Sequence, residues 1–211
     1  MSLNYLINNS YRNSKKIAPV ARLCNEHRPR TQAELAEVIN NYMAEHRVLK
    51  MSSIDDVAAY CYRNQDYIFE EGYKQKLIPY LVLKRYTLPE IQDYCYDLFV
   101  VKTLTGWRWE QKAVADLSLQ LPDQYYLHQE TRLDEDYSVD IAIVDAATGK
   151  HIQGVQVKPD TYSGHEYSDN SNTRKNAKYT CDYQAPVVYL FYNQARKAWN
   201  NFDAVTSTVT D

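Results

Sequence analysis

Three polar side chains interrupt two stretches of sequence that are otherwise suited to burial in a β-sheet. Asp140 lies within S-V-D-I-A-I-V, and Gln156 and Lys158 lie within G-V-Q-V-K-P a few residues later. A carboxylate, an amide or an ammonium group is costly to bury unless it is paired, hydrogen-bonded or bound to a metal. This combination of groups therefore needs a partner, and a cation or an ionic substrate is one that it could take.

The two stretches predict a β-hairpin that turns at Thr148-Gly149. Successive residues of a strand point to opposite faces. The first strand is expected to carry Val139, Ile141 and Ile143 on one face and Asp140, Ala142 and Val144 on the other. In the second strand Val155 and Val157 share a face, and Gln156 and Lys158 share the opposite one.

Two explanations of this polar set stay open at the level of sequence. In the structural one, Asp140 and Lys158 form a cross-strand ion pair on a solvated face. In the functional one, the set forms a site, because Lys158 is followed by Pro159 and a long polar stretch. Functional residues concentrate where a rigid sheet opens into loops in this way.

Asp140 followed by Gln156-Val157-Lys158 resembles the signature of the PD-(D/E)XK nuclease superfamily, the restriction-endonuclease-like fold. In that signature an Asp near the start of one strand precedes Glu-x-Lys on the next strand. Here Gln156 stands in the place of the Glu, which is a known minority form, and Val139 stands where a Pro is frequent.

The elements around the hairpin agree with this resemblance. The pattern predicts a helix over 107–121, a strand over 125–130, the hairpin, a helix over 173–183 and a strand over 186–192. The last strand is the most apolar run of the chain, and we expect it to be buried and parallel to its neighbour. Asp134-Glu135-Asp136 predicts a turn before the hairpin, whose acids are either a rival cation site or simply solvated. The tail after Trp199 receives no assignment. The order αβββαβ is that of the core of the restriction-endonuclease-like fold, an α/β (α+β) class with a mixed sheet flanked by helices.

Glu110 is anomalous within the helix predicted over 107–121. The apolar stripe of this helix consists of Trp107, Val114, Leu117 and Leu121, and Glu110 falls into it. A carboxylate on a core-facing stripe is unusual. It can be explained by a salt bridge or a position at the rim, or by a reach toward Asp140. The resemblance favours the second explanation, because superfamily members often carry a further acidic metal ligand on this helix.

The first half of the chain is expected to be helical. Capping signals begin helices at Thr31 and Ser53, and Thr87 begins a third that runs to about Leu104, before a break at Gly106. Helicity between residues 64 and 86 should be partial, with interruptions near Gly72 and Pro79. Residues 1–30 predict either an ordered arm or a frayed terminus. We therefore divide the chain into a mainly helical region, 1–104, which could be a subdomain or supply arm, dimer or DNA contacts, and a catalytic core, 105–211.

Composition restricts the class of protein. The chain has 211 residues, and its net charge of −3 does not by itself indicate a nucleic-acid partner. No apolar run is long enough for a membrane span and the N-terminus has no signal-peptide pattern, so we expect a cytoplasmic protein without membrane contact. The four cysteines, Cys24, Cys61, Cys95 and Cys181, are far apart, which argues against a disulfide framework or a zinc site.

The resemblance implies a Mg²⁺ site. Asp140 would be the central ligand and Glu110 the second, with the Val157 backbone carbonyl as a third and the Gln156 amide oxygen as a weaker one. Lys158 would orient the attacking water or help to deprotonate it, and would offset charge on the phosphate.

Residues beyond the hairpin are candidates for contacts with DNA. Arg174 and Lys175 lie near the start of a predicted helix with Lys178 one turn later, where phosphates or base edges can be met. The polar stretch before that helix adds Tyr162, His165, Asn170 and Asn172 as candidates for base or backbone contacts.

Taken with the resemblance, these observations predict a Mg²⁺-dependent, sequence-specific endonuclease for double-stranded DNA, of the type II restriction class. One catalytic site per chain and two strands to cut favour a homodimer. The alternatives are a transposon-end or junction nuclease of the same superfamily, a non-catalytic DNA-binding or scaffold protein in which Asp140 and Lys158 merely pair, and a helical protein-interaction module in residues 31–104.

Overall fold

The computed structural model describes residues 3–13, 17–46, 50–75, 85–162 and 171–210. The chain forms two compact units, Met1–Thr105 and Gly106–Asp211. Among the described residues, no helix is both long and apolar enough to cross a membrane. Each unit has its own internal packing, and they are described in turn.

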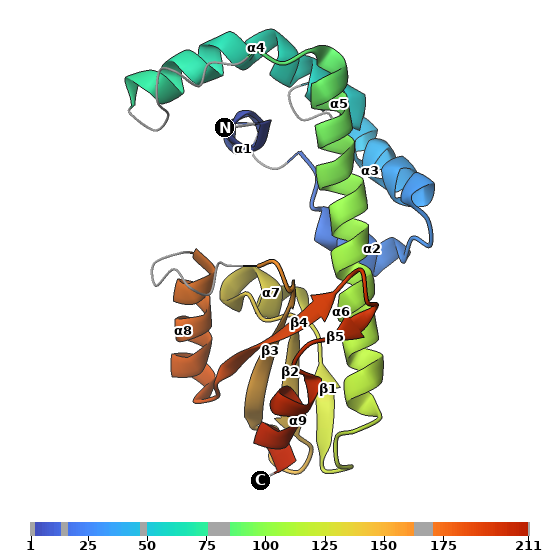
Figure 1. Cartoon of the computed structure of the whole chain (residues 1–211), viewed down its shortest axis with the longest axis vertical. Helices are drawn as coiled ribbons and strands as arrows, with labels where there is room; N and C mark the ends of the chain where they lie inside the picture. Colours follow the sequence, from blue (N-terminus) through green and yellow to red (C-terminus); the bar gives the residue numbers. More distant parts are fainter. Residues whose placement is uncertain (1–2, 14–16, 47–49, 76–84, 163–170, 211) are drawn as a thin grey trace. The chain divides into compact units, whose positions relative to one another are not determined.

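The first unit is built from helices in the ranges that the structure describes (Figure 1). They are α1 (Leu3–Asn13), α2 (Val20–His27), α3 (Gln32–His46), α4 (Ile54–Lys74), α5 (Leu88–Tyr96) and the π-helical segment η3 (Asp97–Lys102), which runs into α6 (Thr103–Ser118). The predicted start signals are confirmed. The Ser53 side chain accepts from the backbone of Asp56, and Thr87 and Glu90 form a reciprocal capping box that opens α5.

Two sequence expectations for this region are wrong, and an open alternative is decided. Of the two alternatives for residues 1–30, the described residues fit an ordered arm rather than a frayed terminus, because α1 and α2 each bury an apolar stripe that includes Leu6, Ile7 and Leu23. Gly72 does not interrupt α4, since its missing side chain leaves room for the Tyr5 ring against the helix. Gly106 does not separate two helices either, because α6 begins at Thr103 and continues through Gly106.

The second unit contains a five-stranded mixed sheet in the order β1-β2-β3-β4-β5. The strands are β1 (Tyr125–His128), β2 (Ile141–Asp145), β3 (His151–Pro159), β4 (Val187–Asn193) and β5 (Ala198–Trp199). Neighbouring strands are antiparallel except for β3 and β4, which are parallel and connected through a helix. The mixed α and β class is as predicted, and so is the parallel pairing of β4, the strand predicted over 186–192.

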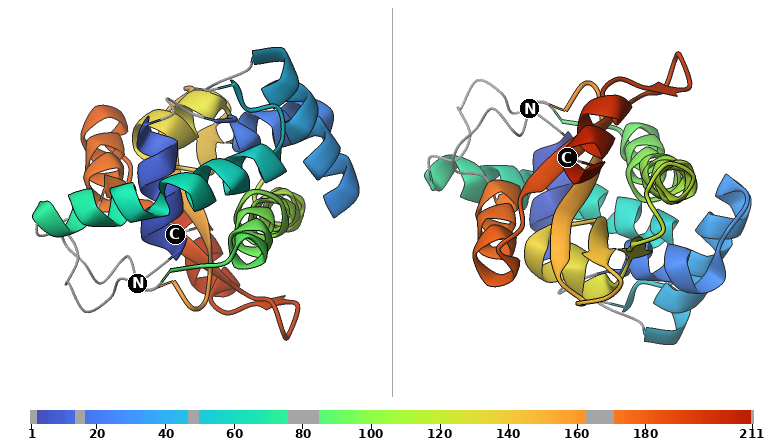
Figure 2. Two further views of the ribbon diagram at one scale, coloured as in Figure 1. Left: turned by 90° about the horizontal axis from the view of Figure 1, so that it is seen from above. Right: turned by 90° about the horizontal axis from the view of Figure 1, so that it is seen from below.

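Helices cover both faces of this sheet (Figure 2). On one face α6 and α9 (Phe202–Thr210) pack against the side chains of Ile141, Ile143 and Val155. On the other face α7 (Thr131–Tyr137) and α8 (Ser171–Tyr183) pack against Ala142 and Val144. Because both faces are buried, the central strands are apolar on both sides, and a polar side chain in them requires a specific partner.

The structure corrects several details of the second unit. Asp134 to Asp136 belong to helix α7 rather than to a turn. Val139 packs on the α7–α8 face with Ala142, because Ser138 adopts a left-handed conformation (φ 53°) and the regular alternation begins only at Ile141.

The buried stripe of α6 and the end of the chain also differ from expectation. The stripe is centred on Trp109, Ala113 and Leu117, and Val114 and Leu121 are only partly buried beside it. Trp107 is not among the residues of this core cluster. The unassigned tail forms β5 and α9.

Gly154 is expected to be the least replaceable glycine of the sheet. A Cβ at this position would lie 2.8 Å from Cε1 of Tyr179 and 3.1 Å from Cγ2 of Val139, both in the tightly packed α8 face. Gly154→Ala should therefore lower the free energy of unfolding by about 1–3 kcal/mol.

Gly106→Ala is the matched control, because a Cβ there meets nothing within 4 Å and the residue is helical. It should leave stability unchanged or raise it by about 1 kcal/mol. Chemical denaturation of both variants measures the difference, and equal stability of the two would contradict this account of the sheet.

Candidate active site

Asp140 lies immediately before β2. Its side chain accepts a hydrogen bond from β3 at the point where the backbone pairing of β2 with β3 ends. Its backbone N–H donates to the Val155 carbonyl oxygen (3.0 Å), and its Oδ2 atom accepts from the Val157 N–H (2.7 Å). The carboxylate thus replaces the next backbone partner of β3. Only 5% of the side chain is exposed. This arrangement fixes the carboxylate relative to β3 without a neighbouring strand.

Lys158 stands beside this carboxylate. Its Nζ atom lies 3.6 Å from Asp140 Oδ2, and 23% of its side chain is exposed. The distance is long for a hydrogen bond but within the range of an ion pair. The ammonium group is therefore held at the site while one side of it remains accessible.

The Val157 carbonyl faces the same side of β3 as the Asp140 carboxylate. The N–H and C=O of one strand residue point toward the same neighbour, and the Val157 N–H points at Asp140. A carboxylate oxygen and a backbone carbonyl oxygen consequently border the same space just before the start of β2.

Glu110 of α6 is electrostatically coupled to this pair. Burial, followed by the negative charge of Asp140, raises the pKa of Glu110 to about 8, and the positive charge of Lys158 acts in the opposite direction. Burial likewise raises the pKa of Asp140, against the effects of Lys158 and of the Val157 N–H. Two carboxyl groups that resist ionising together are characteristic of a functional site rather than of a surface ion pair.

Asp134 is a further acidic neighbour, which the sequence analysis named only as part of a rival cation site. Its negative charge raises the pKa of both Glu110 and Asp140. The sequence analysis assigned it to a turn. Its helical position could have been inferred from the short amphipathic pattern T-R-L-D-E-D-Y, in which Leu133 and Tyr137 are buried.

Gln156 occupies a different environment from its neighbour Lys158. It is 2% exposed and faces α8, where its Oε1 atom lies 3.3 Å from the terminal amide of Asn176. Asn176 is also buried, and its amide lies 2.8 Å from the hydroxyl of Tyr189 on β4. The polar set of the hairpin is thus divided between the Asp140–Lys158 pair and a buried amide pair.

The candidate DNA-contacting residues are distributed over α8 and its approach. Arg174 and Lys175 lie in the first turns of α8, and Lys175 Nζ donates to the Glu135 carbonyl oxygen of α7. Lys178 lies 4.6 Å from the centre of the Tyr137 ring.

Asn172 contributes to local structure, because it hydrogen-bonds both the Ser138 hydroxyl (3.3 Å) and the Tyr162 hydroxyl (3.2 Å). His165 and Asn170 lie outside the described residues.

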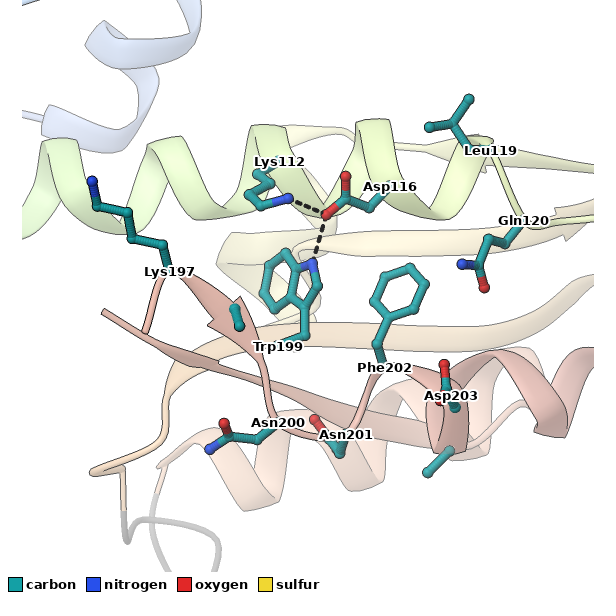
Figure 3. Close-up of a pocket in the computed structure, with 12 residues that line it drawn as sticks. Lys112, Asp116, Leu119, Gln120, Lys197, Trp199, Asn200, Asn201, Phe202 and Asp203 are labelled. Carbon is teal, nitrogen blue, oxygen red and sulfur yellow. Dashed lines mark hydrogen bonds and ion pairs between the residues drawn. The ribbon is translucent and has the colours of Figure 1, made fainter. Parts of the chain in front are cut away.

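A separate groove of about 650 Å³ opens between α6, β5 and the start of α9 (Figure 3). At its floor Asp116 accepts hydrogen bonds from Lys112 and from the indole N–H of Trp199 (2.6 Å). Positive and negative side chains both line it, with Lys197 and Asp203 at its edges. Neither Asp140 nor Lys158 is among its lining residues.

The donors around Asp140 suit a hard divalent cation better than a zinc ion. They are the carboxylates of Asp140 and Glu110 and the Val157 carbonyl, all oxygen atoms, which is the ligand type that Mg²⁺ prefers. Within the described ranges, no group of three or more His, Cys, Asp or Glu side chains is arranged to hold a metal. Water and a phosphate oxygen would have to complete a Mg²⁺ shell here, which is the usual way that this ion binds.

The model of the family described as MjaI restriction endonuclease matches residues 3–199. No curated protein and no solved structure matches the chain.

The raised pKa of Glu110 predicts a pH-dependent cost to the metal-free protein. A carboxyl group whose pKa rises from 4.5 in the unfolded chain to about 8 in the fold holds its proton more tightly when folded. Stability should therefore fall as pH rises through this interval and level off above it. Glu110→Gln removes the titrating group, so the variant should gain about 1–3 kcal/mol on the wild type between pH 5 and pH 8.

Chemical denaturation in EDTA across this pH range measures the difference. Asp123→Asn is a suitable control, because Asp123 is exposed in the turn between α6 and β1. Parallel pH curves for wild type and Glu110→Gln would show that Glu110 ionises normally.

Proposed function

Because the chain belongs to the MjaI restriction endonuclease family, we propose that it is a type II restriction enzyme, a sequence-specific endonuclease that hydrolyses phosphodiester bonds of double-stranded DNA with Mg²⁺. The observation that carries this proposal beyond the family is the pairing of the Asp140 carboxylate with the Val157 N–H and the Lys158 ammonium group just before the start of β2. We assign the chain to the PD-(D/E)XK superfamily in its Gln-x-Lys form on the same residues.

In this proposal Asp140, Glu110 and the Val157 carbonyl hold the metal. A bound Mg²⁺ ion would neutralise charge on the phosphate and increase the acidity of a coordinated water. The rigid hydrogen bond from Val157 to Asp140 holds one carboxylate oxygen in place. Glu110, whose pKa is raised to about 8, would give up its proton when the cation binds.

Lys158 serves the substrate side of the site. Its ammonium group lies 3.6 Å from Asp140 and remains partly exposed, so it can contact a phosphate oxygen or the attacking water without moving far. A positive charge fixed in a partly desolvated position stabilises negative charge that develops on the phosphate.

DNA would be held by α8 next to the catalytic residues. Arg174 and Lys175 stand at the N-terminal end of this helix, where the helix dipole also favours phosphate. Since each chain supplies one such site, cutting both strands is most simply done by a homodimer with two-fold symmetry. The helical residues 1–104 would then supply arm, dimer or DNA contacts.

Cleavage of plasmid and phage DNA tests the activity directly. Discrete fragments are expected with Mg²⁺ and none with EDTA. Asp140→Asn and Lys158→Met should each reduce the rate by at least about 100-fold, because each removes a charge next to the scissile phosphate.

The folded state of these variants must be verified, since removal of one partner of a buried ion pair can destabilise a protein by about 3–5 kcal/mol. Asp123→Asn should cut like wild type. A wild-type protein that binds DNA but cuts none across varied sequences would instead indicate a binding protein, in which Asp140 and Lys158 only pair.

Metal binding can be measured without cleavage. Mg²⁺ or Mn²⁺ should raise the melting temperature of the wild type, and the increase should grow between pH 6 and pH 8 as Glu110 loses its proton more easily. The increase should be absent in Asp140→Asn. A shift of equal size in wild type and variant would place the metal elsewhere.

The contribution of α8 to DNA binding predicts a change in salt dependence. Arg174→Gln and Lys175→Gln should each weaken binding to all sequences alike and reduce the slope of log K against log salt by about 1. Binding is measured in an Asp140→Asn background to prevent cleavage. Lys150→Gln is the control, because Lys150 precedes β3 at the opposite end of that strand from Lys158. An unchanged slope in the α8 variants would exclude this helix from the interface.

A further inference from the structure

We propose that Asn176 is a positioning residue of the active site, a buried amide on α8 that holds the two chain segments carrying Asp140 and Lys158. This inference rests on the proposed function and names a residue that touches neither metal nor phosphate. It starts from the burial of a polar side chain that has no share in the Asp140–Lys158 pair.

Asn176 is one of the two residues that α8 buries among its described side chains, the other being Tyr179. It is 8% exposed, and Gln156 beside it is 2% exposed. A buried amide is costly unless its hydrogen bonds are made, and an apolar pair of the same shape could fill this space at no loss of stability. Two amides at this position therefore indicate a role for their directional bonds.

Those bonds reach the segment that leads into Asp140. The Asn176 amide is oriented so that both its nitrogen and its oxygen have hydrogen-bond partners. In this orientation its nitrogen donates to the carbonyl oxygens of Tyr137 (2.9 Å) and Ser138 (3.2 Å). Its oxygen then accepts from the Tyr189 hydroxyl (2.8 Å). Ser138 is the left-handed residue that ends α7 and turns the chain toward Asp140. The bonds from Asn176 thus hold the chain where its direction changes before the catalytic carboxylate.

The same amide also contacts the second catalytic segment. In the same orientation its oxygen accepts from Tyr189, the β4 residue paired with Gln156, and it packs against the Gln156 side chain without a hydrogen bond. The next two residues of β3 are Val157, which binds Asp140, and Lys158. One side chain therefore lies against the segments that lead into both partners of the Asp140–Val157 hydrogen bond, Ser138 on one side and Gln156 on the other. Since α8 also carries Arg174 and Lys175, a phosphate that moves this helix would move the catalytic segments with it.

The proposal predicts a specific defect in Asn176→Leu, which fills the space without hydrogen bonds. The Val157 N–H should exchange with solvent at least about tenfold faster, because its bond to Asp140 is no longer held in place. The Mg²⁺ concentration for half-maximal cleavage should rise about 10- to 100-fold, the range found when residues that orient metal ligands are replaced. DNA affinity should stay within about twofold, since the basic residues of α8 remain.

The double variant Gln156→Leu/Asn176→Leu separates positioning from packing and remains informative if the single variant unfolds. With both amides replaced, the melting temperature should recover in part, because no amide remains buried against an apolar side chain. The fast exchange at Val157 should persist. Ala177→Ser, an exposed change beside Asn176 on α8, is the control and should leave every readout at the wild-type value.

Wild-type exchange at Val157 together with wild-type Mg²⁺ dependence in Asn176→Leu would overturn the proposal and leave the proposed function standing. Recovery of Val157 protection in the double variant would also overturn it, since Asn176 would then act through packing alone. If the wild type cleaves no DNA, the proposed function fails, and the exchange rate at Val157 in the metal-free protein still decides whether Asn176 holds the Asp140 segment.

Discussion

The hydrogen bond from the Val157 N–H to the Asp140 carboxylate is the interaction on which the site depends. Strand β2 begins only at Ile141, so β3 extends beyond its antiparallel partner and leaves a backbone donor that must be satisfied. Asp140 satisfies it with a side chain instead of a backbone carbonyl. The carboxylate thereby gains a fixed position, and its second oxygen is directed by the same geometry. A structural requirement of the sheet and a chemical requirement of the site are met by one residue.

Electrostatics make this region unfavourable for the protein alone. Glu110, Asp140 and Asp134 come from three different elements, and the negative charges of Asp140 and Asp134 raise the pKa of Glu110 to about 8, with Lys158 as an opposing cation. A fold selected only for stability would replace such a set with apolar side chains. Retaining it is characteristic of functional sites, where stability is lost in exchange for groups that bind a cation or a charged substrate.

The two faces of the sheet carry different kinds of side chain. The α6–α9 face is apolar and aromatic, with Trp109 stacked on Tyr192 (4.7 Å between ring centres), and it supports Glu110 from a rigid helix. The α7–α8 face combines tyrosine packing with the amide pair of Gln156 and Asn176. The site lies just before the start of β2, where residues of both faces meet. Its geometry therefore responds to helices on either side of the sheet.

Much of this arrangement followed from local sequence. The alternation in β2 and β3, the capping signals at Ser53 and Thr87 and the apolar run of β4 are short-range patterns. They were sufficient for the order of β1, β2, β3, α8 and β4 and for the parallel pairing of β4 with β3. The polar residues of the hairpin identified Asp140 and Lys158 as neighbours, and the misplaced carboxylate on α6 identified Glu110. In each case a residue contradicts the burial pattern of its own element, which a sequence displays directly.

Other features depended on contacts between residues that are distant in sequence. Helix α1 forms because α4 covers its apolar stripe, and Gly72 stays helical because the Tyr5 ring occupies the space that it leaves. The rotation of α6 toward Trp109 is likewise decided by the sheet against which it packs.

At the candidate site, the charge of Asp134 acts on Glu110 and Asp140 from another element, and Asn176 meets Gln156 only when α8 lies on β3. Sequence alone therefore determined which residues were chemically unusual. Tertiary packing decided which of them meet, because long-range contact and desolvation arise only when separate elements are brought together.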